Sequence, residues 1–76
     1  MDKASAIYWV RSKVSKQELR MISLGEEYTD TFQHRGKTVI LHIERDEDHP
    51  NQFEVMFSMR GEDDHHSTLT KKEVGL

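Results

Sequence analysis

Two adjacent histidines near the C-terminus, His65 and His66, are the residue types in this chain that most directly suggest chemistry. They follow three carboxylates, Glu62–Asp64, and imidazole and carboxylate groups are both metal ligands. Adjacent histidines in a polar segment rarely converge on one ion, and no two histidines have the i, i+4 spacing of a helical metal site. The sequence therefore predicts no metal site and no cofactor.

Catalytic residues are also difficult to place. His42 lies within an alternating stretch, on the face opposite the apolar side chains, so we interpret it as a half-exposed strand residue rather than a general base. No serine has a G-x-S-x-G context, and the cysteine count of 0 removes a thiol nucleophile. We expect a protein that is not an enzyme.

The acidic run Asp46-Glu47-Asp48 has three interpretations. It lacks the D-x-D-x-D-G pattern of a calcium loop, so an oxygen-ligand metal site is disfavoured. A charged turn of this kind keeps a small protein soluble. It can also steer and dock a basic partner surface.

Basic residues form two stretches, the segment Arg11–Arg20 and the turn His34–Lys37. Aromatic residues lie beside the first stretch. Tyr8 and Trp9 could stack on nucleic-acid bases, although the net charge of -3 argues mildly against a phosphate-binding surface. The candidate nucleic-acid-binding residues are Arg11, Lys13, Arg35 and Lys37.

The element that would organise these residues is an antiparallel hairpin over residues 38–60. Its two arms alternate apolar and polar residues around the turn 46–51, the period-2 pattern of strands with one buried face. Matching the apolar faces predicts the pairs Val39–Phe57, Leu41–Val55 and Ile43–Phe53.

A third strand, residues 28–33, precedes this hairpin. A two-residue turn at Arg35-Gly36 would join it to the next strand. The resulting register predicts that Asp30 points inward on an edge strand, where a charge discourages sheet-to-sheet aggregation. It also pairs Phe32 with Val39 and Tyr28 with Ile43.

The N-terminal segment carries a helix-start signal at Ser15. Ser15-Lys16-Gln17-Glu18 has the S-x-x-E form of a capping box, and Val14 with Leu19 forms a hydrophobic staple around it. We therefore expect a helix from Lys16 to Gly25. Residues 6–14 can be a strand or a separate helix, and one continuous helix over 3–24 would leave Trp9 off its apolar face.

The 76-residue chain is expected to be α+β: an N-terminal helical element packed on a C-terminal antiparallel meander of three, possibly four, strands. We place this domain at residues 1–61 and a polar, flexible tail at 62–76, with a short strand at 67–70 as the alternative. The absence of cysteine, signal peptide and membrane-spanning stretch favours the cytoplasm and no membrane contact.

A domain of this size buries only about 60% of its unfolded surface, so a partner is the natural source of extra stability. We expect a protein-binding module, a regulator or inhibitor of a larger partner, acting as a homodimer or in a complex. This character is typical of phage proteins, and a nucleic-acid-binding regulator is the alternative. The candidate protein-binding residues are Tyr8, Trp9, Ile40, Met56, Asp46, Glu47 and Asp48.

Overall fold

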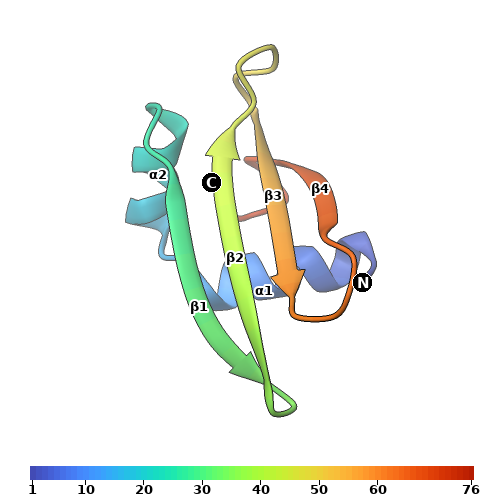
Figure 1. Cartoon of the computed structure of the whole chain (residues 1–76). Coiled ribbons are helices and arrows are strands. Elements are labelled where there is room, and N and C mark those ends of the chain that lie inside the picture. The colour runs from blue at the N-terminus through green and yellow to red at the C-terminus, as the bar shows by residue number, and fades with distance from the viewer.

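The computed structural model describes residues 1–76 and has two helices packed on one face of a four-stranded antiparallel sheet (Figure 1). The predicted α+β fold is confirmed, and the meander has four strands in the order β1-β2-β3-β4. Neither helix is long and apolar enough to cross a membrane. The elements are α1 (Lys3–Lys13), α2 (Lys16–Ser23), β1 (Tyr28–His34), β2 (Lys37–Arg45), β3 (Gln52–Met59) and β4 (His65–Thr70).

The N-terminal segment forms two helices that separate at the predicted capping box. Val14 is extended (φ -117°, ψ 125°), and the Ser15 hydroxyl accepts a hydrogen bond from the Glu18 N–H at 3.1 Å. Residues 6–13 are therefore helical and belong to α1, which was one of the two alternatives, and Val14 ends that helix as its extended C-cap. Gly25, at φ +114°, follows the end of α2 and has the left-handed backbone that glycine favours.

The β1–β2 hairpin has the predicted turn and register. Arg35 and Gly36 have φ values of 52° and 76°, the positive pair required by a type I′ turn. Phe32 pairs with Val39 and Tyr28 with Ile43, as the matching of apolar faces predicted.

Asp30 lies opposite Leu41 on the edge strand, where we expected an inward charge. It is half-buried, and its carboxylate accepts a hydrogen bond from the Tyr28 hydroxyl at 3.3 Å. Burial raises the pKa of Tyr28 above its usual value, and the charge of Asp30 raises it further. The inward carboxylate is thus partnered inside the domain.

The predicted register between β2 and β3 is wrong by two residues. Because side chains alternate with period 2, the shift keeps the same apolar face inward, so periodicity alone could not distinguish the two registers. The loop decides between them: the Asp46 N–H donates to the Gln52 carbonyl at 3.0 Å, which extends β2 to Arg45. The observed pairs are Val39–Met59, Leu41–Phe57, Ile43–Val55 and Arg45–Phe53.

The flexible tail predicted for residues 62–76 is also wrong, and the alternative strand is present. β4 pairs with β3 and places Leu69, 0% exposed, opposite Phe53. The turn that follows buries Val74, 3% exposed, and the Lys71 N–H donates to the Asn51 carbonyl at 2.9 Å. The last residues are therefore part of the domain, because they close one side of its core.

The core lies between the helices and the inner face of the sheet. All of its 13 buried residues are hydrophobic, and no buried side-chain polar atom lacks a hydrogen-bond partner. α1 contributes Ala6 and Val10, and α2 contributes Leu19 and Ile22. This packing leaves the second face of the sheet uncovered.

Candidate functional site

The face of the sheet turned away from both helices, here called the open face, is covered by no element of the chain (Figure 1). Its side chains alternate with the buried ones along every strand. Hydroxyl-bearing residues are the commonest type. The open face comprises Thr29, Thr31, Gln33, Thr38, Ile40, His42, Glu44, Gln52, Glu54, Met56, Ser58, His66, Thr68 and Thr70.

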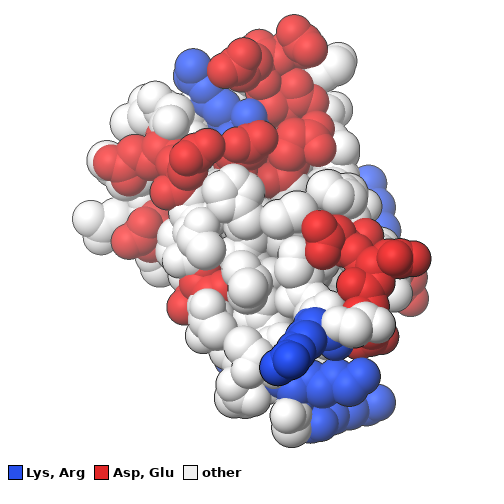
Figure 2. All heavy atoms as spheres, viewed as in Figure 1, with Lys and Arg blue, Asp and Glu red and all other residues white.

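Two large apolar side chains lie near the middle of the open face. Ile40 is 42% exposed and Met56 is half-buried. They are diagonal neighbours on β2 and β3, because Ile40 pairs with Ser58 and Met56 pairs with His42. Uncharged atoms fill the centre of this face (Figure 2), so a flat partner could contact it without desolvating a charge.

Charge gathers at the two ends of the open face (Figure 2). The acidic end is formed by the α2–β1 connection and the β2–β3 loop, and the basic end by the β1–β2 turn and the end of β3. Glu62 moderates the basic end through an ion pair with Lys37 at 3.3 Å. The acidic end carries Glu26, Glu27, Asp46, Glu47 and Asp48. The basic end carries Arg35, Lys37 and Arg60, and beside them the β3–β4 connection carries the acidic residues Glu62, Asp63 and Asp64.

Asp46 orders the acidic loop. Its carboxylate accepts a hydrogen bond from the Asp48 N–H at 3.0 Å and lies 3.2 Å from the His49 ring. Partial burial acts to raise the pKa of Asp46, but hydrogen bonds from Asp48 and His49 outweigh it and hold the pKa below its usual value. The loop is thus a shaped, anionic end to the open face.

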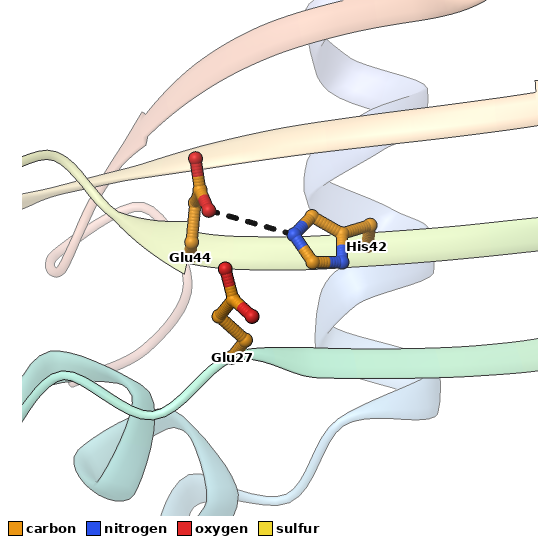
Figure 3. Close-up of side chains that lie close together, drawn as sticks. All are labelled: Glu27, His42 and Glu44. Carbon is orange, nitrogen blue, oxygen red and sulfur yellow. Dashed lines mark ion pairs between the residues drawn. The ribbon is translucent and has the colours of Figure 1, made fainter.

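Glu27, His42 and Glu44 converge at this acidic end (Figure 3). One ligand atom from each lies within 4.8 Å of the others, and His42 Nε2 is 3.6 Å from Glu44 Oε2. The other ring nitrogen, His42 Nδ1, is 2.9 Å from Thr29 Oγ1. The set brings together Glu27, from the connection just before β1, with two residues of β2.

Sequence reasoning missed this cluster, although it predicted the register that forms it. Thr29 and His42 are paired across β1 and β2, and Glu44 follows His42 by two residues on the same face. Reading the register for polar neighbours as well as apolar ones would have revealed it. His42 was assigned only to a half-exposed strand position, which it does occupy.

The two histidines first considered as ligands are placed differently. His65 and His66 are consecutive residues of β4, so their side chains point to opposite faces of the sheet. His65 is within hydrogen-bond distance of Ser67 Oγ, at 3.0 Å, while His66 lies on the open face. The two rings cannot share one ion in this arrangement.

A second surface surrounds Trp9 at the basic end. The indole stacks on Phe32 with ring centroids 5.0 Å apart, His34 meets it edge-on at 4.9 Å, and Lys13 Nζ lies 4.8 Å from the centre of the Phe32 ring. A groove of ≈ 390 Å³ lies beside this cluster. Its lining includes Trp9, His34, Arg35, Lys37 and Glu62.

The predicted protein-binding residues are divided between these two surfaces. Ile40 and Met56 lie on the open face, and Asp46–Asp48 lie at its acidic end. Tyr8 and Trp9 do not join them, because α1 packs on the opposite face of the sheet. Tyr8 is 63% exposed on the helix side.

The predicted nucleic-acid-binding residues are divided as well. Arg35 and Lys37 line the groove beside Trp9, and Lys13 Nζ lies 5.6 Å from the centre of the Trp9 ring. The Arg11 side chain lies elsewhere, near Gly75 at the C-terminal end of the chain. A Cβ atom added to Gly75 would be 3.7 Å from the Arg11 guanidinium.

No protein-family model, curated protein or solved structure matches this chain. A functional proposal therefore rests on the chain's own surfaces.

Proposed function

We propose that this chain is a small, non-enzymatic protein-binding module that docks through the open face, and that its partner there is a second copy of itself. The observation that carries this proposal is a four-stranded sheet covered by helices on one face only. Ile40 and Met56 give the bare face an apolar centre, and methionine and aliphatic side chains in such a setting are suited to a buried interface.

The distribution of charge supports a second copy as the partner. A dimer with two-fold symmetry brings the same patch of each chain together. With the two sheets antiparallel, the acidic end around Asp46–Asp48 would face the basic end around Arg35 and Arg60 of the other copy. Opposite potentials at both ends favour this orientation over a parallel one.

The size of the chain also favours association. A single core of 13 buried residues gives a small domain little reserve of stability, and burying the open face would add apolar contact. In the cytosolic role that the sequence predicts, such a module would regulate or inhibit a larger partner by occluding or bridging it. The phage origin considered from the sequence adds nothing to this argument.

Light scattering of the purified, untagged chain tests the proposal. We expect a dimer, and we expect Ile40→Glu or Met56→Glu to raise its dissociation constant at least about tenfold, since each buries a charge at the centre of the interface. Tyr8→Glu is the matched control: Tyr8 is also a large exposed side chain but lies on the helix side, so that variant should stay dimeric.

Circular dichroism would confirm that each variant is folded. A wild-type chain that stays monomeric at every concentration would contradict self-association. A folded Ile40→Glu variant that remains dimeric would show that the chain associates through another surface. Weaker association in 1 M salt is expected, because salt screens the paired ends.

The groove beside Trp9 favours a second candidate function, the binding of single-stranded nucleic acid. An aromatic side chain flanked by Arg35 and Lys37 can stack on a base while the cations contact phosphate. Binding of an oligonucleotide should fall steeply with salt and weaken in the double variant Arg35→Ala/Lys37→Ala. Arg11→Ala is the control, because Arg11 lies away from the groove. Absent or salt-insensitive binding would remove this candidate.

A further inference from the structure

We infer that Glu27, His42 and Glu44 form a binding site for a divalent transition-metal ion of the zinc class. The three side chains approach one another from adjacent segments of the open face, with one ligand atom of each inside a 4.8 Å separation (Figure 3). This proposal does not rest on dimerisation, because all three ligands belong to one chain.

A residue outside the cluster, Thr29, orients the His42 ring so that it can bind a metal ion. His42 Nδ1 lies 2.9 Å from Thr29 Oγ1, and in the tautomer whose Nδ1–H donates this hydrogen bond the lone pair is on Nε2. That atom is the one facing Glu44, at 3.6 Å. A hydrogen bond that fixes the second nitrogen is the usual support for a metal-ligating histidine, because it sets the tautomer and the ring plane.

The ligand types select the class of ion. One imidazole nitrogen with two carboxylates suits zinc and its neighbours among the first-row dications, whereas calcium and magnesium prefer oxygen ligands alone. The two carboxylates also supply the negative charge that compensates a dication. The fold gives these groups no basic partner of their own among its ion pairs other than His42 itself.

The ligands can close on an ion with little change of backbone. Zinc bonds to nitrogen and oxygen ligands are about 2.0–2.2 Å long, so the ligand atoms must approach one another by roughly an ångström or more. The Glu44 side chain is 48% exposed, and Glu27 lies in the exposed segment before β1, so both can rotate. His42, held by Thr29, is the fixed member of the set.

Three protein ligands leave the fourth position of a tetrahedral ion facing away from the sheet. Nothing in this chain covers that position, because the open face carries no other element. Water would occupy it in the isolated chain. The ion would therefore lie at the acidic end of the open face with one exchangeable ligand.

Isothermal titration of the full, chelator-treated chain with Zn²⁺ alone tests this inference. We expect one ion per chain, and an affinity at least about tenfold lower in His42→Gln. Thr29→Val should lower the affinity by about 10- to 100-fold, since loss of an outer-shell partner typically has that effect. Both substitutions are at exposed or half-exposed positions, so both variants should fold. Circular dichroism would verify this.

Two controls separate this site from general attraction of cations. His66→Gln removes a histidine from the same face, and Glu47→Gln removes an acid from the same end, so neither should change the Zn²⁺ affinity by more than about twofold. Saturable binding lost with His42 and retained in both controls supports the site. Absence of saturable binding, unchanged binding in His42→Gln, or equally tight binding of Ca²⁺ would overturn it.

Discussion

Glu73 connects the two ends of the chain through three contacts. Its Oε1 accepts the Thr70 N–H at 2.9 Å, its own N–H donates to Thr70 Oγ1 at 3.1 Å, and its Oε2 pairs with Lys3 Nζ at 3.0 Å. The first two are the reciprocal bonds of a capping box. The hydrogen bond from the Thr70 backbone, followed by that from Lys3, holds the pKa of Glu73 below its usual value of 4.5.

This lowered pKa predicts an acid-dependent loss of stability at one residue. Because the folded chain binds the Glu73 proton less readily than the unfolded chain, the contribution is complete above the unfolded pKa, near 4.5, and disappears as the pH falls through the folded value. Glu73→Gln should therefore be less stable than the wild type at pH 7, and the difference should shrink below about pH 4.5.

Urea unfolding at a series of pH values measures that difference. Glu47→Gln is the control, because no hydrogen bond or ion pair engages the Glu47 side chain. A gap between wild type and Glu73→Gln that stays constant from pH 7 to acid would contradict the role given to its charge.

At the same scale, the sequence predicted those features that depend only on residues adjacent in the chain. The helix cap at Ser15 is encoded by four consecutive residues. The β1–β2 turn is encoded by the pair Arg35-Gly36, which has the two positive φ angles that a two-residue turn requires. The role of His42 was not predicted, because it depends on residues distant in the sequence: Thr29, on the neighbouring strand, and Glu27, in the connection before β1. Such a cluster becomes visible only when a register is drawn in full.

At the scale of elements, β4 is the feature that the sequence described least well. Of the three inward positions of this strand, His65 and Ser67 are polar and only Leu69 is apolar. The period-2 signal therefore has a single member and resembles a polar tail. The strand forms because the β3 edge offers free backbone groups and Leu69 fills the core beside Phe53.

Leu69→Ala measures how much this element contributes. Leu69 is 0% exposed, so its truncation removes buried methyl groups and leaves a cavity, which should lower the free energy of unfolding by about 2–5 kcal/mol. Thr68→Ala, its exposed neighbour on the open face, should change stability by less than about 0.5 kcal/mol. Chemical denaturation distinguishes the two.

If Leu69→Ala were as mild as Thr68→Ala, residues 62–76 would behave as the tail that the sequence suggested.

The β2–β3 register shows a second limit of the sequence pattern. Two registers related by a shift of two residues bury the same face, so hydrogen bonds in the loop, and not the apolar pattern, choose between them.

At the scale of the whole molecule, the arrangement is one-sided. Hairpin connections alone predicted that acidic and basic residues would gather at opposite ends of the strands. Figure 2 shows an acidic and a basic end, together with a further acidic cluster beside the basic end, where the β3–β4 connection carries Glu62–Asp64. Hairpin connections do not determine which face a helix covers. For that reason the sequence grouped Trp9 with Ile40, whereas the fold places the sheet between them.

The strand order also has a consequence for the speed of folding. Each strand pairs only with its neighbours in the sequence, so every pairing can form by closing a short loop, with little loss of chain entropy. The Arg35-Gly36 turn is the shortest of these loops. The helices make the distant contacts, and the most distant in sequence is the meeting of α1 with β4, which joins the two ends of the chain. We therefore infer that the hairpins form early and that docking of the first helix completes the domain.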